Sequence, residues 1–363
     1  MIKKVYFVFI LLTPFIIGSE TKPNNIVLPP GFSISIFAKN IYGARQLTTG
    51  PGNSLYIGTR GDGVYAVFDD NKDFIADRTV KILEKLNAPN GVLYHDGFLF
   101  VAEIHRVTRY SVKNNGLPDV KSMKVINDSF SHDRRHGYKY IKLGPDNKLY
   151  IPVGVPCNVC QNSDERYGTI MRMNLDGSAL EIYARGIRNS VGFDFHPDTG
   201  QLWFTDNGRD SMGDDIPPDE LNHAPVKDMH FGFPFIHGAL VRDPDFWKKA
   251  PAVDMIPPAQ ELGPHVAALG MTFYRGSQFP AKYAGSIFIA EHGSWNRSVP
   301  IGYRISLVTL SQNRAASYAV FVEGWLEGRS AWGRPVDILE YYDGSLIVSD
   351  DTGNALYRIR YSL

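Results

Sequence analysis

The sequence predicts an all-β fold, a six-bladed β-propeller that is closed by pairing of the N-terminal strand with the last blade. The first observation is a pattern that occurs six times: an apolar run, a turn of Gly, Asp or Asn, and a second apolar run. Such turn residues adopt the positive backbone angles of tight hairpins, so each copy has the composition of a β-hairpin. The six copies are residues 47–60, 91–104, 141–154, 193–207, 279–292 and 338–351.

The spacing of the copies is the second observation. The Leu or Ile that opens the second apolar run recurs at intervals of 44, 50, 53, 85 and 59 residues. A repeat of roughly 40 to 50 residues built from strands and turns is typical of propeller blades. After most copies, a further alternating run predicts the next strand of the blade. These runs are residues 63–68, 107–112, 170–175, 303–310 and 355–361.

The two ends of the chain predict how the ring closes. Residues 31–39 alternate between apolar and polar side chains, and the sixth copy ends close to the C-terminus. An open ring would expose a long unpaired strand edge. We therefore expect the N-terminal strand to complete the last blade; a separate edge strand is the alternative.

The composition is that of one globular domain. The chain has 363 residues, of which 44% are hydrophobic and 21% charged, and propellers of this length form single units because each blade adds its own layer of core. Lys plus Arg and Asp plus Glu number 38 each. The formal net charge is therefore zero, and neither nucleic acid nor an acidic membrane surface is indicated as a partner.

Residues 1–19 predict a signal peptide. Two lysines precede an apolar stretch from Val5 to Gly18, which is short for a membrane span and typical of a secretory signal. We expect export to the periplasm or out of the cell, a propeller over residues 20–363, and no membrane span after signal removal. An uncleaved anchor is the alternative.

Cys157 and Cys160 are the only cysteines. In an exported protein, a local disulfide between them is the natural interpretation. C-type haem attachment would need His at the position of Gln161, and structural zinc would need two further ligands. A thioredoxin-like redox pair would need a βαβ context, which the strand pattern does not provide.

Polar residues beside the hairpins are the candidates for function, since propellers carry their sites in loops around the central channel. His136 precedes the third hairpin, Arg188 and Asn189 the fourth, and Arg334 the sixth. A histidine there can act as a base near neutral pH, and two arginines can hold a carboxylate-rich ligand. Structural roles are the alternative, because a lone histidine is often structural and arginines also form plain ion pairs.

The largest insertion, residues 205–234, lies between the fourth and fifth hairpins. Its carboxylates could bind calcium through their oxygens, or simply be solvated. They are Asp206, Asp210, Asp214, Asp215, Asp219 and Glu220.

Four stretches make the chain similar to a known family. From about residue 28 onward it resembles the soluble glucose/sorbosone dehydrogenases, six-bladed quinoproteins that use pyrroloquinoline quinone (PQQ). The CNVC and EHGSWNR segments resemble the sorbosone dehydrogenase-like branch more than the glucose dehydrogenases. The matching stretches are residues 136–154, residues 186–210 with 214–222, residues 270–298 and residues 333–351.

The resemblance implies roles for individual residues. His136 matches the catalytic histidine that takes the proton from the sugar hydroxyl while hydride passes to the quinone. Arg188 and Asn189 match a pair that contacts the cofactor, Asn207 a cofactor-contacting amide, and Arg334 an arginine that pairs with the cofactor carboxylates.

The resemblance also implies a calcium site. Gly208 and Arg209 match the position whose backbone carbonyls hold the calcium that polarises the quinone, a Lewis-acid role. Asp219 and Glu220 resemble an acidic pair near the active site.

Three positions differ from the glucose dehydrogenases. Arg209 stands where they carry proline, and Val336 stands where they carry the second arginine of the cofactor clamp. Their clamping lysine falls in the EHGSWNR loop, which has no lysine. Asn296 or Arg297 in that loop could compensate.

The function expected from the resemblance is oxidation of an aldose or a related aldehyde, with a soluble acceptor or cytochrome to reoxidise the cofactor. Two alternatives remain. A metal-dependent sugar lactonase would need channel carboxylates on several inner strands, where this chain has His136, Arg188 and Arg334. A non-catalytic propeller that binds a protein or glycan is favoured by Val336 and the missing lysine.

Overall fold

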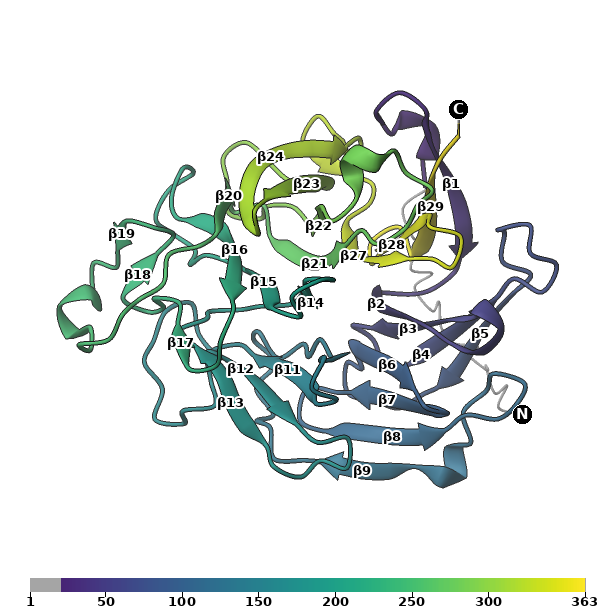
Figure 1. Cartoon of the computed structure of the whole chain (residues 1–363), viewed down its shortest axis with the longest axis horizontal. Coiled ribbons are helices and arrows are strands. Elements are labelled where there is room, and N and C mark those ends of the chain that lie inside the picture. The colour runs from purple at the N-terminus through teal and green to yellow at the C-terminus, as the bar shows by residue number, and fades with distance from the viewer. Residues whose placement is uncertain (1–20, 363) are drawn as a thin grey trace, which may run out of the picture.

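The computed structural model describes residues 21–362. The predicted signal peptide, residues 1–19, lies outside them and stays a prediction. Within the described residues, six sheets stand around a central axis, as Figure 1 shows. Each sheet has four antiparallel strands, and the third gains a parallel fifth, β17. The predicted six-bladed β-propeller is therefore confirmed.

The first three blades follow the chain in order. Blade 1 contains β2 (Ala44–Thr49), β3 (Leu55–Thr59), β4 (Val64–Phe68) and β5 (Arg78–Leu83). Blade 2 contains β6 (Gly91–His95), β7 (Phe98–Ala102), β8 (Val107–Ser111) and β9 (Lys124–Asn127). Blade 3 contains β10 (Lys142–Leu143), β11 (Leu149–Val153), β12 (Thr169–Met173), β13 (Glu181–Arg185) and β17 (Met229–His230).

The last three blades complete the ring. Blade 4 contains β14 (Phe193–Phe195), β15 (Leu202–Asp206), β16 (Pro218–Ala224) and β20 (Gln260–Pro264). Blade 5 contains β21 (Ala268–Phe273), β22 (Ile287–Glu291), β23 (Arg304–Ser311) and β24 (Arg314–Val322). Blade 6 contains β27 (Pro335–Glu340), β28 (Leu346–Asp350), β29 (Ala355–Tyr361) and β1 (Phe32–Lys39).

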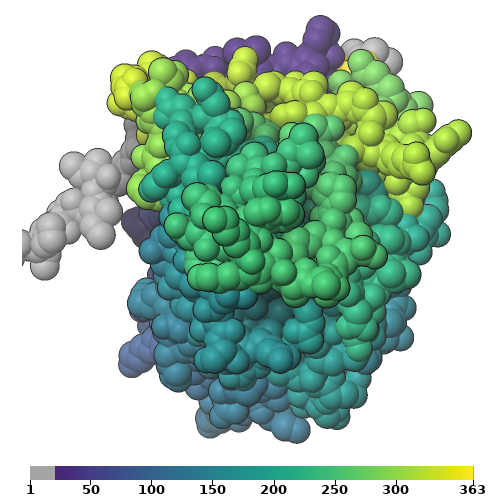
Figure 2. All heavy atoms as spheres, turned by 90° about the vertical axis from the view of Figure 1, so that its left-hand side faces the viewer, coloured from purple at the N-terminus to yellow at the C-terminus, as the bar shows by residue number. Residues whose placement is uncertain are grey.

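Short elements lie outside the blades. The pairs β18 (Ile236–His237) with β19 (Val241–Arg242), and β25 (Leu326–Glu327) with β26 (Ser330–Ala331), form two small ribbons. The helical elements are single 3-10 turns: η1 (Pro23–Asn25), η2 (Pro51–Asn53), η3 (Val120–Ser122), η4 (Trp247–Lys249) and η5 (Ala281–Tyr283). The insertion after β16 carries β17 to β19 and η4, and Figure 2 shows it in green on the side of the ring.

The ring closes as predicted. β1 pairs with β29 in antiparallel register from Phe32 opposite Tyr361 to Lys39 opposite Ala355. The ring of Phe32 meets Phe279 and Phe321 edge-on, at centroid distances of 4.8 and 5.1 Å. These two rings belong to blade 5, so the closing strand also joins the last two blades.

The core contains six large clusters, one at each interface between neighbouring blades, and one small cluster of three residues. The interface between blades 1 and 2, for example, packs Tyr56 and Val64 against Val92 and Leu99, all fully buried. Because every blade buries both faces against a neighbour, the ring is continuous. The innermost strands of the blades are therefore held at fixed positions around the channel.

The fifth hairpin prediction was wrong in its first half. Residues 279–286 contain η5 and no strand; the innermost strand of blade 5 is β21, which begins at Ala268. Pro280 lacks a backbone N–H and Gly285 has a φ of 69°, so this apolar stretch forms a turn and not a ladder. Its apolar side chains are nevertheless core residues, Phe279 and Tyr283 among them.

Candidate active site

In each blade, the start of the innermost strand lies beside the end of the second strand, because the two are antiparallel. Ala44 is opposite Thr59, Ala268 opposite Glu291, and Pro335 opposite Asp350. The loops before inner strands and after second strands therefore gather at one end of the channel, and a pocket of about 360 Å³ lies there.

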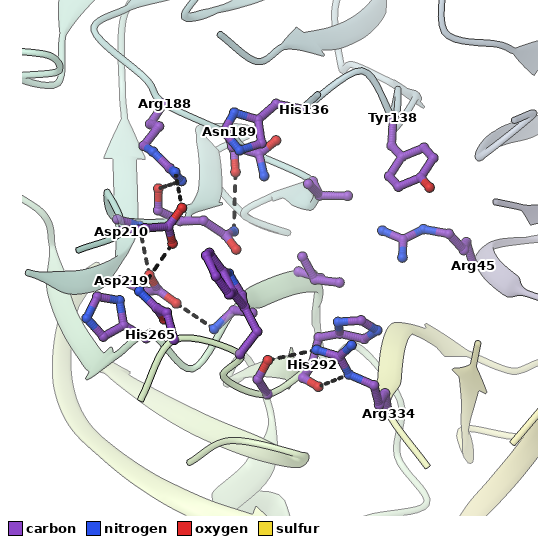
Figure 3. Close-up of a pocket in the computed structure, with 18 residues that line it drawn as sticks. Arg45, His136, Tyr138, Arg188, Asn189, Asp210, Asp219, His265, His292 and Arg334 are labelled. Atoms are coloured by element: carbon purple, nitrogen blue, oxygen red, sulfur yellow. Dashed lines mark hydrogen bonds and ion pairs between the residues drawn. The ribbon is translucent and has the colours of Figure 1, made fainter. Parts of the chain in front are cut away.

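The pocket draws residues from five blades, and no described residue of blade 2 lines it. The lining consists of Arg45, His136, Tyr138, Arg188, Asn189, Val191, Asn207, Gly208, Asp210, Asp219, His265, Ala267, Leu269, His292, Gly293, Trp295, Asn296 and Arg334. Figure 3 shows His136, Arg188, Asn189, Asp210 and Asp219 on one side and Arg45, Tyr138, His292 and Arg334 toward the other. Most of the predicted site residues thus meet in one cavity.

His136 is held in a defined tautomer. Its Nδ1 lies 2.8 Å from the carbonyl oxygen of Val155. A carbonyl only accepts hydrogen bonds, so Nδ1 carries the proton and Nε2 keeps its lone pair. Burial, together with the nearby Arg188 guanidinium, lowers the pKa of His136 to about 3. The imidazole is therefore neutral at pH 7 and available as a proton acceptor.

Arg188 is buried and bound by the disulfide loop. Its Nε donates to the Asn158 carbonyl at 2.8 Å, and one Nη donates to Asn158 Oδ1 at 2.9 Å. The same Nη lies 3.1 Å from Asp210 Oδ2. The predicted disulfide between Cys157 and Cys160 is present, and Asn158 lies between the two cysteines in the sequence. The disulfide thus flanks the residue that orients Arg188.

Asp206 holds the main chain next to Arg188. Its carboxylate accepts the backbone N–H groups of Arg188 and Asn189, at 2.7 and 2.6 Å. Asn207 follows directly, and its amide donates to the carbonyl oxygens of Asn189 and Ala268, at 3.2 and 2.7 Å. These bonds fix the segment that carries Asn189 and Asn207 on the pocket wall.

Asp219 faces the pocket, whereas Glu220 does not. Asp219 accepts the N–H of Gly208 at 2.8 Å and that of Ala267 at 2.6 Å, and burial raises its pKa to about 6. Glu220 accepts the N–H of Gly238 at 2.6 Å, behind the wall. Neighbouring residues of a strand point to opposite faces, so the predicted acidic pair contributes one carboxylate, not two.

Arg209 and Arg297 are not among the lining residues. The Arg209 guanidinium pairs with Asp243, so its side chain is directed away from the pocket. Arg297 donates to the carbonyl oxygens of Asp214, at 2.5 Å, and Val299, at 3.1 Å. Arg297 therefore does not replace the missing lysine.

Asn296 and Val336 complete the predicted positions. Asn296 lines the pocket, and its Oδ1 is buried without a hydrogen-bond partner. Val336 packs with Val191 and Leu269 in a small apolar cluster. The place of the second clamp arginine is therefore a hydrophobic wall beneath the pocket.

Arg334 lies on the pocket wall, opposite Arg188. Its Nε donates to the His292 carbonyl at 3.0 Å and one Nη to the Gly293 carbonyl at 2.8 Å. Its own N–H donates to Asp350 Oδ1 at 2.9 Å. Both Arg188 and Arg334, expected to face the channel, do so.

Sequence reasoning missed five lining residues with polar or aromatic side chains: Arg45, Tyr138, His265, His292 and Trp295. Arg45 stands at the start of an inner strand, as Arg334 precedes one, so its position in the first repeat could have identified it. Trp295 is 73% exposed, and an exposed tryptophan at a pocket rim is itself a sign of ligand binding.

The polar groups of the pocket fit a planar, carboxylate-bearing cofactor such as PQQ. Three arginines line it, and guanidinium groups bind carboxylates through paired hydrogen bonds. The orphaned Asn296 Oδ1 offers an acceptor to a ligand donor. Within residues 21–362, no group of three or more His, Cys, Asp or Glu side chains is placed to hold a metal ion. The same residues contain no helix of the length and hydropathy needed to cross a bilayer.

Comparisons with known proteins find relatives in sequence. An uncharacterized protein of Borreliella burgdorferi is 38% identical over 97% of this chain and 95% of its own length. A PQQ-dependent pyranose dehydrogenase of Coprinopsis cinerea is 28% identical over 32% of this chain and 18% of its own length.

Solved structures share the fold. The holo form of the PQQ domain of pyranose dehydrogenase from Coprinopsis cinerea has a TM-score of 0.77 at 17% identity, over 92% of this chain and 97% of its own. The PQQ-bound aldose sugar dehydrogenase of Streptomyces coelicolor has a TM-score of 0.64 at 17% identity, over 93% and 100%. The family model described as Glucose / Sorbosone dehydrogenase matches residues 101–296. The chain therefore belongs to the glucose/sorbosone dehydrogenase family.

Proposed function

We propose that this protein is an exported, PQQ-dependent dehydrogenase that oxidises a sugar of the aldose or sorbosone type. The observation that carries the proposal is the meeting of three arginines and His136, a neutral histidine with a free Nε2, in a single pocket. Such a pocket suits an anionic cofactor with a proton acceptor beside it. Structural neighbours described as PQQ-bound sugar dehydrogenases support the same reading.

His136 is the proton acceptor in this proposal. Its Nδ1–H is held by the Val155 carbonyl, so Nε2 can take the proton from the sugar hydroxyl at the carbon to be oxidised. PQQ, when bound, supplies the acceptor for the hydride that leaves that carbon. Trp295 lines the pocket and is largely exposed, so it offers an apolar face to the sugar ring.

Arg188, Asn189, Asn207 and Arg334 bind and orient the cofactor. The guanidinium groups of the two arginines are fixed by protein carbonyls and carboxylates, so little side-chain freedom is lost on binding.

The backbone carbonyls of Gly208 and Arg209 are the proposed calcium ligands. Calcium prefers oxygen ligands, and Asp219 fixes the Gly208 peptide through its N–H at 2.8 Å. Two pocket carboxylates, Asp210 and Asp219, add negative charge on this side.

The remaining steps lie outside the pocket. A soluble acceptor, either a cytochrome or a quinone, would reoxidise the cofactor after each turnover. Export to the periplasm or the medium, with removal of residues 1–19, follows from the predicted signal peptide.

Equilibrium titration of the purified apo-protein with PQQ, with and without calcium, tests the proposal. We expect tight, calcium-dependent binding, followed by dye reduction when a panel of aldoses is offered. Absence of PQQ binding under both conditions would overturn it. Hydrolysis of sugar lactones by the same sample would then support a lactonase, and inactivity toward both would support a binding propeller.

A further inference from the structure

Arg45 is a buried arginine on the pocket wall that none of the matched stretches contains. It is the second residue of β2 in blade 1, and its side chain is 4% exposed. Its Nε donates to Asn90 Oδ1 at 2.5 Å, and Nη1 donates to Asp351 Oδ2 at 3.1 Å. The guanidinium carbon lies 4.8 Å from the ring centre of Tyr138. The group is therefore held rigidly, and Figure 3 shows it directed into the pocket.

The wall around Arg45 presents two guanidinium groups to the pocket, those of Arg45 and Arg334. Arg45 pairs with Asp351, and Asp351 also pairs with Arg60 at 3.4 Å. His292 lies 2.9 Å from the same carboxylate, but burial lowers the pKa of His292 to about 4, so it is neutral at pH 7. Arg334 is bound by two neutral carbonyls. The Arg334 guanidinium thus has no carboxylate partner among the described side chains, although Asp350 accepts its backbone N–H, and an anion in the pocket would bind between Arg45 and Arg334.

The other positions considered for the cofactor clamp are not able to supply this charge. Val336 is part of an apolar cluster, and Arg297 binds main-chain carbonyls outside the pocket. Arg45 reaches the pocket from blade 1.

We infer that Arg45, with Arg334, binds a carboxylate of PQQ and takes the place of the clamp residues that this chain lacks. The inference rests on the proposed function and assigns one end of the pocket to the carboxylates of the cofactor. The opposite end, with His136, Gly208 and Asp219, is left for the quinone and the sugar.

The test is equilibrium binding of PQQ to the calcium-loaded apo-protein, without any turnover. Arg45→Gln should weaken binding by about 10- to 100-fold, the range for one hydrogen bond between charged groups. Arg45→Lys keeps the charge but not the paired donors, so it should lose less. Arg60→Gln is the matched control: Arg60 pairs with the same Asp351 but does not line the pocket, and its loss should leave the affinity within about twofold.

A second ligand separates direct contact from damage to the fold. The trimethyl ester of PQQ keeps the ring system but loses the carboxylate charges. The parent should prefer PQQ to the ester, and Arg45→Gln should reduce that preference by the factor by which it weakens PQQ binding. Equal losses for both ligands would mean that Arg45 acts through the structure, and would overturn the inference.

The outcomes also separate the inference from the proposed function. If the parent protein binds no PQQ, the proposed function fails and the inference with it. If the parent and Arg45→Gln bind PQQ equally tightly, the proposed function stands and the role of Arg45 is refuted.

Discussion

Replacement of His136 by alanine separates proton transfer from cofactor binding. Nε2 of His136 is the free acceptor, since Nδ1 is committed to the Val155 carbonyl at 2.8 Å. Loss of a general base lowers a rate by about 10²- to 10⁴-fold, which corresponds to about 3–5 kcal/mol in the activation barrier. Because the imidazole is uncharged at pH 7, as its pKa of about 3 requires, PQQ affinity should fall by no more than about 10-fold, the upper end for one neutral hydrogen bond.

The assay is stopped-flow reduction of the PQQ-loaded variant by a saturating aldose, beside a PQQ titration of the same sample. His105→Ala is the control, since His105 lies outside the pocket lining and stacks on His132 with ring centres 4.5 Å apart. That variant should reduce at the parental rate. A His136→Ala protein that is reduced at the parental rate would refute the role of the base. A loss of PQQ affinity as large as the loss of rate would assign His136 to cofactor binding instead.

Three further changes test the surroundings of the pocket. Asn158→Ala removes the hydrogen bond from Arg188 to Asn158 Oδ1 and keeps the one to the Asn158 backbone carbonyl, so it should weaken PQQ binding about 3- to 10-fold in a titration; reduction of the flanking disulfide should act in the same direction, and an unchanged affinity in both would contradict this role. Burial raises the pKa of Glu220. Its contribution to the free energy of unfolding is therefore fully present below the pKa of the unfolded state, near 4.5, and is lost as the pH rises through the raised pKa of the folded state. Glu220→Gln should therefore reduce the fall in the free energy of unfolding between pH 5 and pH 8 by about 1–3 kcal/mol in urea denaturation, and equal falls would contradict the assignment. Phe32→Ala should lower that free energy by about 2–4 kcal/mol, whereas Ser35→Ala, exposed on the same strand, should change it by less than about 0.5 kcal/mol; similar losses would disprove closure through the Phe32 ring.

The propeller could be predicted because its signal is local and repeated. Each hairpin needs its own turn residues and its own apolar pair of strands, so six independent copies support one architecture. The fifth copy misled because apolar core residues also occur in loops: Phe279 and Tyr283 fill the core from a turn around η5. Composition alone does not separate a buried turn from a strand.

The site was harder to predict, because it depends on which way side chains point. Asp219 and Glu220 are adjacent in the sequence, yet strand alternation sends one to the pocket and the other behind the wall. Arg297 lies next to the lining residue Asn296 but turns to main-chain carbonyls. Arg45 was missed because its partners, Asn90 and Asp351, are 45 and 306 residues away.

The central claim is that this pocket binds PQQ and passes the electrons of a sugar to it. The most direct test is anaerobic addition of aldoses to protein loaded with one equivalent of PQQ and calcium, with the quinone absorbance recorded and the sugar products identified. We predict that the absorbance bleaches and that one sugar is oxidised per quinone. Bound quinone whose spectrum stays unchanged by every aldose, with no oxidised sugar formed, would contradict the account.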